Sequence, residues 1–245
     1  MMTDETRPAY EAFVAERRER IMGVLRDAAR RAGRDASEVT LLAVSKTVGV
    51  DEAVCAWRAG YTTFGENRPQ ELRRKASGFA AVEGMADVRL DMIGNLQTNK
   101  INQVIGCAHL VHSVSSLHLA EAISKRAAAR DTTMRILLEV NVSGEASKSG
   151  FSPLEVRQAL DEALALPALS IEGVMTMAPA HDPDAARRTF AGLRELRDSL
   201  REASGLPLDT LSCGMSDDFG IAVEEGSTLV RLGRIVFDPA YPLDV

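Results

Sequence analysis

The residue with the clearest chemical potential in this sequence is Lys46, the last residue of the apolar run LLAVSK (41–46). Such a run predicts a buried strand, so Lys46 would lie at its carboxyl end, where the active sites of β/α barrels are found. An amine that is partly removed from water loses its charge more readily, and a neutral amine can attack an aldehyde to form an imine. The competing interpretation is a solvated lysine just past a strand, and for an isolated lysine that interpretation is the stronger one.

Two later segments favour a binding site for a phosphate group. SCGMSDD (212–218) and LVRLG (229–233) each contain a predicted strand end, and barrel phosphate sites are frequently built from the loops after strands seven and eight. Ser216 would offer a hydroxyl and an amide, and the amides of Gly233 and Arg234 would follow the eighth strand. The alternative for Gly233 is that it only permits a turn. Together with the lysine on the first strand, these segments favour a phosphate-bearing aldehyde as the ligand.

Arg231 is the third candidate, and it lies within a predicted strand. Alternation along that strand places it on the same face as Leu229 and Gly233 and opposite Val230 and Leu232. A charged side chain on a barrel strand is costly unless it is paired. The structural interpretations are an exposed arginine or one in a salt bridge near the rim. The functional interpretation is a hydrogen-bond donor to the pyridine nitrogen of a cofactor.

Other residues give weaker signals. Asn67 follows the second predicted strand, and a cap for the next helix is an equal alternative to a ligand contact. Met175 and Met177 lie in the sixth predicted strand, where methionine more often fills a core than lines a cofactor site. Lys148 lies in the loop after the fifth strand and would reach the rim, but a solvated loop lysine is as good an interpretation. The four histidines show no metal-ligand spacing.

The elements that must position these residues alternate along the chain. A long helix is predicted from about residue 8 to 31, within an N-terminal region of 1–35. Eight strands then alternate with helices, although none is expected after the last strand. The predicted strands are 41–46, 62–67, 88–94, 110–114, 134–142, 169–178, 210–215 and 228–233. The predicted helices are 50–60, 69–78, 98–105, 116–130, 152–166, 183–204 and 218–226.

This alternation predicts an α/β protein with a parallel sheet and helices outside it. Eight such units can close into a single (β/α)8 barrel of the TIM type, here spanning 40–238 with the extra N-terminal helix before it. The competing fold is an open doubly wound sheet, whose first turn would carry a glycine-rich phosphate signature. The first turn here is SKTVGV, with one glycine, and no linker divides the chain. We therefore expect a single barrel domain over residues 1–245.

Composition excludes several classes of function. The net charge is −6 and aromatic residues make up 4%, so neither a basic footprint nor base-stacking platforms for nucleic acid are expected. No apolar run is long enough for a membrane span, and the N-terminus lacks the apolar stretch of a signal peptide. The three cysteines are far apart and fit reduced thiols. These features predict a soluble, cytoplasmic protein that binds neither nucleic acid nor membranes.

Taken in order, short motifs across nearly the whole chain resemble those of the pyridoxal phosphate homeostasis proteins. They are VSKT around Lys46, FGEN at 64–67, IGNLQTNK at 93–100, SKSG at 147–150, GVMTM at 173–177, GMSDD at 214–218 and GSTLVRLG at 226–233. Each string is weak alone, but the ordered set is specific. The resemblance implies a barrel like the amino-terminal domain of bacterial alanine racemase, with pyridoxal 5'-phosphate as its cofactor.

The resemblance also implies roles for individual residues. Lys46 would form the Schiff base, Arg231 would face the ring nitrogen, and Ser216, Gly233 and Arg234 would hold the phosphate. The remaining candidate cofactor contacts are Asn67 and Met175.

Three positions depart from the family pattern. Leu90 and Asp91 stand near the place where the family usually has an aromatic residue and a histidine. Arg234 replaces a threonine, which removes one hydroxyl donor to the phosphate while leaving the backbone amide. Its guanidinium would either bind phosphate directly or point away. Asp238 follows Phe237 where the family usually has glycine.

The expected function is a carrier that buffers the cofactor and delivers it to apo-enzymes. A charged arginine at the ring nitrogen cannot accept a proton, which weakens the cofactor as an electron sink. Alanine racemase also uses a tyrosine base from a second domain of the partner subunit, and this chain extends only about a dozen residues beyond its eighth predicted strand. The alternatives are an amino acid racemase or lyase of low activity, or a barrel enzyme in which Lys46 forms an imine with a phosphorylated sugar. A monomer is expected because a closed barrel has no sheet edges.

Overall fold

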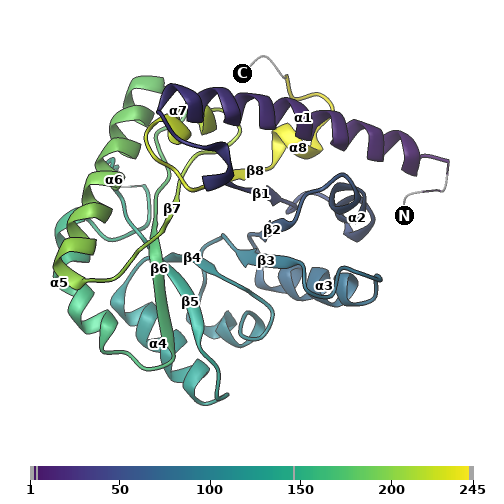
Figure 1. Cartoon of the computed structure of the whole chain (residues 1–245). Helices are drawn as coiled ribbons and strands as arrows, with labels where there is room; N and C mark the ends of the chain where they lie inside the picture. The colour runs from purple at the N-terminus through teal and green to yellow at the C-terminus, as the bar shows by residue number, and fades with distance from the viewer. Residues whose placement is uncertain (1–2, 4, 146, 243–245) are drawn as a thin grey trace.

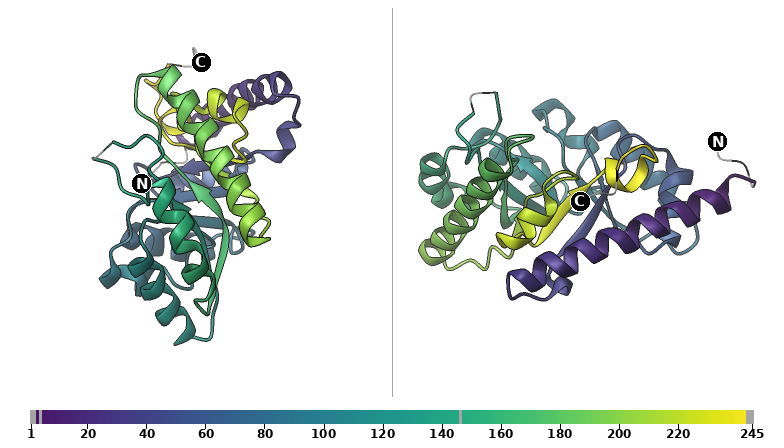
Figure 2. Two further views of the ribbon diagram at one scale, coloured as in Figure 1. Left: turned by 90° about the vertical axis from the view of Figure 1, so that its left-hand side faces the viewer. Right: turned by 90° about the horizontal axis from the view of Figure 1, so that it is seen from above.

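The computed structural model describes residues 3, 5–145 and 147–242. Its first element is α1 (Arg7–Arg31), which begins with a proline in its first turn and is followed by Gly33 at a φ of +66°. Val14, Ile21 and Leu25 are buried along one side of this helix, at the spacing predicted for an amphipathic helix. The helix packs against other helices. The top view in Figure 2 shows it running along the outside of the molecule.

Eight parallel strands form a closed barrel in the order β1 to β8, with β8 paired to β1 (Figure 1). The strands are β1 (Thr40–Val44), β2 (Thr63–Glu66), β3 (Arg89–Met92), β4 (Val111–Val114), β5 (Met134–Glu139), β6 (Leu169–Met175), β7 (Thr210–Ser212) and β8 (Leu229–Leu232). The predicted TIM-type barrel is confirmed, and the open doubly wound sheet is wrong. All eight predicted strands exist, and each is shorter than its predicted segment. Seven of them end earlier than predicted, because the residues at the carboxyl end belong to the loops of the rim, whereas β4 is shorter only at its amino end.

The helices lie around the outside of the barrel (Figure 1). After α1 they are α2 (Val50–Arg58), α3 (Pro69–Ala80), α4 (Leu117–Ala128), α5 (Pro153–Leu164), α6 (Pro183–Ser204), α7 (Phe219–Glu224) and α8 (Arg234–Phe237). Two 3-10 helices, η1 (Ala36–Glu38) and η2 (Thr98–Gln103), complete the set within the described ranges. The expectation of no helix after the last strand is wrong, because α8 is a single turn and too short to show a periodicity.

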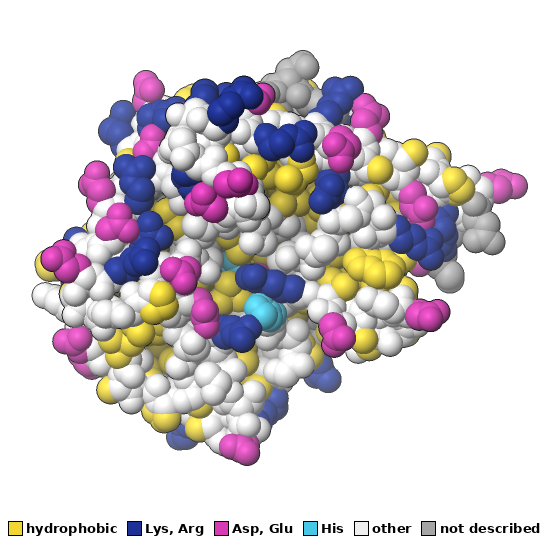
Figure 3. Space-filling view, viewed as in Figure 1, with side chains coloured by type: hydrophobic (Ala, Val, Ile, Leu, Met, Phe, Trp, Pro, Cys, Tyr) yellow, Lys and Arg dark blue, Asp and Glu magenta, His cyan; other side chains and the backbone are white. Residues whose placement is uncertain are grey.

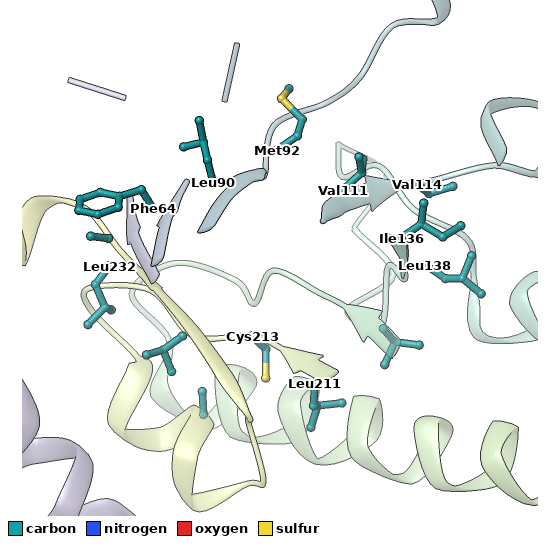
Figure 4. Packing of buried hydrophobic residues seen from close by; sticks show 14 of the residues in the cluster. Phe64, Leu90, Met92, Val111, Val114, Ile136, Leu138, Leu211, Cys213 and Leu232 are labelled. Atoms are coloured by element: carbon teal, nitrogen blue, oxygen red, sulfur yellow. The ribbon is translucent and has the colours of Figure 1, made fainter. Parts of the chain in front are cut away.

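The largest apolar layer lies between the barrel and its helices. Side chains that point outward from the strands, among them Phe64, Ile136, Leu138, Leu211 and Leu232, form one buried cluster with the inner faces of the helices (Figure 4). Successive residues of a strand point to opposite sides, so each strand gives every second side chain to this layer. This layer is the main hydrophobic core.

The interior of the barrel is different in character. It holds two small apolar clusters, one of Leu42, Val44 and Leu229, the other of Leu110, Leu137 and Met175. Other buried side chains on the inward face of the strands are polar or charged, including Asp91, His112, Glu139, Ser212 and Arg231. The interior is thus a packed but polar core, which is unusual because buried polar groups must find partners.

The face of the molecule seen in Figure 3 shows no large patch of a single charge sign. Basic and acidic side chains are intermixed over the face seen in Figure 3. In the described part of the chain, no helix combines the length and the apolar character needed to cross a membrane.

Candidate functional site

Lys46 lies in the loop that leaves β1, two residues beyond the last residue of that strand. Its side chain is exposed at the carboxyl-terminal rim. The expectation that it sits on the rim is therefore met, whereas the expectation that the protein itself partly buries it is wrong. Its amine is accessible to a ligand in the mouth of the barrel.

A buried ion pair fixes the backbone on both sides of Lys46. Lys75 on α3 donates from Nζ to the carbonyl oxygens of Ser45 at 2.8 Å and Val48 at 2.9 Å, and to Glu66 Oε1 at 2.5 Å. The Ser45 hydroxyl donates to the same carboxylate oxygen at 2.7 Å. Lys75 and Glu66 are 1% and 0% exposed, so water competes little for these bonds. The loop that presents Lys46 is thereby tied to β2 and α3.

The second part of the site lies where the loops after β7 and β8 meet. Ser216 is buried in the first loop, and its Oγ accepts a hydrogen bond from the amide of Ile235 in α8 at 3.4 Å. Gly233 precedes α8 and the amide of Arg234 opens it, where no earlier turn supplies an acceptor. Loops after strands seven and eight, followed by a short extra helix, are the usual phosphate site of β/α barrels.

The structure gives Gly233 a steric role rather than a turn role. Its φ is −114°, which any residue can adopt. A Cβ at this position would lie 3.3 Å from Cβ of Val44 and 3.4 Å from the Val44 carbonyl oxygen. Gly233 therefore lets the end of β8 approach the end of β1 closely, which brings the two halves of the site together.

The guanidinium of Arg234 is engaged by its own loop. It bonds Asp217 at 2.5 Å and stacks over the ring of Tyr241, with 5.1 Å between Cζ and the ring centroid. Tyr241 donates its hydroxyl to the same carboxylate, and that bond is the largest cause of the lowered pKa of Asp217. Of the two roles predicted for Arg234, the structure thus favours a backbone contact. The hydroxyl of Tyr241 is likewise occupied, because it is bonded to Asp217.

Arg231 is buried in the barrel, so neither the exposed nor the salt-bridged interpretation holds. Its Nη1 donates to Ser212 O at 2.9 Å and Oγ at 2.8 Å, and its Nη2 donates to the Thr176 carbonyl oxygen at 3.1 Å. Burial lowers the pKa of Arg231, and the nearby carboxyls of Asp218 and Glu139 act in the opposite direction. A guanidinium has more N–H donors than these acceptors use, so it retains donors for a ligand.

The weaker candidates lie in different environments, at the rim, in the barrel interior and in a loop. Asn67 follows β2 at the rim and is half-buried, but the residue that caps α3 is Arg68, so the capping interpretation is wrong. Met175 is buried in the barrel interior beside Leu110 and Leu137, where it forms part of the floor below the rim. Lys148 forms an ion pair with Glu145 and donates to the Met177 carbonyl oxygen at 3.2 Å. These contacts hold its loop to the loop after β6.

Sequence reasoning missed several polar residues of the barrel interior. Glu139 ends β5, is 2% exposed, and has no hydrogen-bond partner for Oε2 within the described structure. Burial raises its pKa, which the positive charge of Arg231 partly offsets. His112 and Ser212 are buried and bonded to each other, and Asp91, noted only as a departure, is bonded to His112. Alternation along each strand was the available signal, but it does not reveal which inward positions face each other across a barrel.

The geometry defines the class of ligand. The accessible amine of Lys46 fits an aldehyde. The buried hydroxyl of Ser216 and the amides at the start of α8 fit a phosphate group. The buried guanidinium of Arg231, which has donors to spare, fits an acceptor atom in a ring. The unpartnered Oε2 of Glu139 is a further polar group that a ligand would satisfy. No group of three or more His, Cys, Asp or Glu residues that could hold a metal ion occurs among the described residues. The site therefore belongs to a barrel that binds a phosphorylated carbonyl compound.

Comparison with known proteins agrees with this class. The family model described as "Alanine racemase, N-terminal domain" matches residues 23–239. A pyridoxal phosphate homeostasis protein of Aquifex aeolicus is 38% identical over 223 residues, 91% of this chain and 96% of the relative. One of Pseudomonas aeruginosa is 39% identical over 227 residues, 91% of this chain and 94% of the relative. The chain belongs to the alanine racemase N-terminal domain family and, within it, to the pyridoxal phosphate homeostasis proteins.

A solved structure supports the same relationship. The solved structure of PipY from Synechococcus elongatus has pyridoxal phosphate bound. It aligns with this chain at a TM-score of 0.78 and 30% sequence identity, and the alignment covers 91% of this chain and 99% of that chain.

Proposed function

We propose that this protein binds pyridoxal 5'-phosphate as a Schiff base on Lys46 and buffers or delivers the cofactor to apo-enzymes. It acts as a monomer in the cytoplasm, with one barrel domain that includes the N-terminal helix. The observation that carries the proposal is the close approach of Gly233, at the end of β8, to Val44, at the end of β1. It brings the loop of the exposed Lys46 to the part of the rim where Ser216 and the start of α8 lie. The names of the relatives, and the cofactor in the structure of PipY, point to the same ligand.

Each residue then has a defined task. Lys46 supplies the amine, and the ion pair of Lys75 and Glu66 holds the loop that presents it. Ser216 and the amides at the start of α8 bind the phosphate, and Arg231 donates to the ring nitrogen. Asn67 and Met175 provide contacts at the edge and the floor of the site. Bound pyridoxal phosphate supplies a carbonyl that reacts reversibly with amines.

Several features support a carrier over a catalyst. Arg231 can only donate a hydrogen bond, so the ring nitrogen that faces it stays unprotonated and the ring is a weak electron sink. The hydroxyl of Tyr241 is bonded to Asp217 and so is not a free base. The relatives are likewise named for homeostasis rather than for a reaction. The competing function is an amino acid racemase or lyase of low activity, for which the buried carboxyl of Glu139 would be the residue to examine.

The first experiment is the visible absorption spectrum of the purified protein with pyridoxal phosphate, recorded before and after borohydride reduction and followed by peptide mass mapping. We expect an imine band that bleaches, with the added mass on Lys46. Lys46→Ala should lose the band, whereas Lys125→Ala, which removes an exposed lysine on α4, should keep it. No band, or a mass confined to other lysines, would refute the proposed anchor and would favour the sugar-phosphate alternative.

A second experiment separates delivery from catalysis. The loaded protein is mixed with an apo-enzyme that depends on pyridoxal phosphate, and recovery of that enzyme's activity is compared with recovery from the same amount of free cofactor in the presence of a phosphatase. A carrier should protect and transfer the cofactor. Turnover of an amino acid at enzyme-like rates, dependent on Lys46, would contradict the carrier function.

A further inference from the structure

A continuous chain of hydrogen bonds crosses the interior of the barrel from β8 to β3. Arg231 Nη1 donates to Ser212 Oγ, whose oxygen lies 3.0 Å from His112 Nδ1. The other ring nitrogen of His112, Nε2, lies 3.0 Å from Asp91 Oδ2. Arg89 closes the chain, with Nη2 bonded to Oδ2 of Asp91 at 2.8 Å and Nε bonded to Oδ1 at 3.0 Å. Every member except Arg89 is buried.

The two ends of this chain fix its direction. A guanidinium can only donate, so Ser212 Oγ must accept from Arg231. Burial alone would raise the pKa of Asp91, but its hydrogen bonds and charge interactions with His112 and Arg89 outweigh burial and lower it. Asp91 is therefore a carboxylate that can only accept, and the Nε2 of His112 must carry a hydrogen.

The remaining choice is whether Nδ1 of His112 also carries a hydrogen. Burial lowers the pKa of His112, and the positive charges of Arg231 and Arg89 add to that effect, although Asp91 opposes it. The imidazole is therefore neutral at neutral pH, and Nδ1 presents a lone pair. The one hydrogen of the Ser212 hydroxyl then goes to Nδ1, and a Ser212 lone pair faces Arg231.

We propose that Asp91 is a positioning residue for Arg231: it fixes His112 as the Nε2–H tautomer, and His112 in turn orients the Ser212 hydroxyl as an acceptor for the guanidinium. Asp91 touches neither Arg231 nor the rim and acts through two intervening side chains. The inference rests on the proposed function, because it gives Arg231 its fixed orientation toward a ring nitrogen. Arg231 is thereby held before a ligand arrives, which reduces the conformational cost of binding.

Asp91→Asn provides a sharp test because an amide has a single acceptor oxygen. Arg89 can only donate, so it claims that oxygen and leaves the amide N–H groups facing Nε2 of His112. The imidazole must then change to the Nδ1–H tautomer. Ser212 Oγ would accept from Nδ1–H, and the chain would no longer direct the hydroxyl hydrogen away from Arg231.

The experiment uses the full chain labelled with nitrogen-15, first without ligand. The nitrogen chemical shifts of His112, assigned by comparison with His112→Gln, report its tautomer, and the Nη signals of Arg231 report whether its guanidinium rotates. We expect the neutral Nε2–H form with separate, slowly exchanging Nη signals in the wild type. Asp91→Asn should give the Nδ1–H form with averaged Nη signals. Asp87→Asn, the same change at an exposed residue just before β3, should leave both unchanged.

Pyridoxal phosphate titrations complete the test. Asp91→Asn should bind roughly tenfold more weakly than the wild type, as expected for a weakened hydrogen bond to a charged group. Ser212→Ala should weaken binding similarly while His112 keeps the Nε2–H form, because Asp91 is still present. If Asp91 and Ser212 served stability alone, both variants would lower the unfolding temperature. Affinity would then not fall together with a tautomer change in Asp91→Asn and without one in Ser212→Ala.

The outcomes separate the inference from the function on which it rests. An Nδ1–H or doubly protonated His112 in the wild type would overturn the inference, as would separate Nη signals and unchanged affinity in a folded Asp91→Asn variant. Where Asp91→Asn does not fold, Ser212→Ala replaces it, and wild-type Nη signals in that variant overturn the inference. A wild-type protein that binds no pyridoxal phosphate refutes the proposed function, while the spectra without ligand still judge the positioning of Arg231.

Discussion

The inner and outer layers of this barrel are built from alternate residues of the same strands, yet they differ in chemistry. On β5, Leu138 points outward into the large apolar cluster, whereas Leu137 points inward to a cluster of only three buried residues. On β8, Leu232 packs outward and Arg231 points inward. The outer layer joins strands to helices through apolar contact, whereas the inner layer combines small apolar clusters with a chain of buried polar groups.

This difference shows how the molecule separates stability from ligand binding. Outer contacts remove apolar surface from water, which is the dominant favourable term in folding. Burying the inner polar groups costs free energy unless they are hydrogen-bonded, and the bonds that satisfy most of them also fix their orientation. Two ion pairs follow the same division. The buried pair of Glu66 and Lys75 lies on the outer side of the strands and holds the loop after β1, whereas buried Asp91 and half-buried Arg89 belong to the inner chain.

The largest expected effect tests the outer layer. Leu138→Ala should lower the free energy of unfolding by about 3 kcal/mol, because it removes a side chain that is 2% exposed from a close-packed cluster. Leu154→Ala, the same change at a side chain that is 65% exposed on α5, should change it by less than about 0.5 kcal/mol. Chemical denaturation measures both. Equal effects of the two substitutions would contradict the assignment of Leu138 to the main core.

A similar effect is expected from the buried ion pair outside the barrel. Lys75→Met leaves the Glu66 carboxylate buried without its charge partner and should cost about 3 kcal/mol of unfolding free energy. Adding Glu66→Gln removes the unpaired charge and should restore part of that loss. Lys125→Met, at an exposed lysine, is the matched control and should be nearly neutral. A double variant less stable than Lys75→Met alone would argue against an unpaired charge as the cause.

A smaller effect is expected from the inner layer, where the pKa of buried His112 makes the stability depend on pH. Burial lowers the pKa of His112 below 6.5, so the unfolded chain takes up a proton before the folded protein does. The stability contributed by neutral His112 is present above that pH and is lost as the pH falls. Between pH 7 and 5.5, this residue should reduce the free energy of unfolding by about 1 kcal/mol.

His112→Gln should flatten that part of the pH profile, and His118→Gln, at an exposed histidine of α4, should not. Denaturant unfolding at several pH values measures the slope of each variant. A slope in His112→Gln equal to that of the wild type would show that His112 is not buried in its neutral form.

The architecture and the outline of the rim can be predicted from local sequence patterns. Strict alternation of eight short apolar runs with amphipathic segments predicts a closed parallel barrel, because period and spacing are properties of neighbouring residues. The ends of the runs then mark the rim, so the sequence alone predicts that Lys46, Ser216 and Gly233 lie there. The face on which Arg231 lies also followed from alternation.

The contacts between inward residues of different strands, in contrast, depend on how the barrel closes. His112 contacts Ser212 from 100 positions earlier in the chain, and Asp91 lies 21 positions before His112. Strand tilt and stagger in a closed barrel set such contacts, and no local pattern encodes them. The same holds for Lys75, which reads as an ordinary lysine of a surface helix until folding places its ammonium beneath the loop of Lys46. Burial, and with it the charge state and the hydrogen-bond partner of each polar group, is a property of the assembled fold.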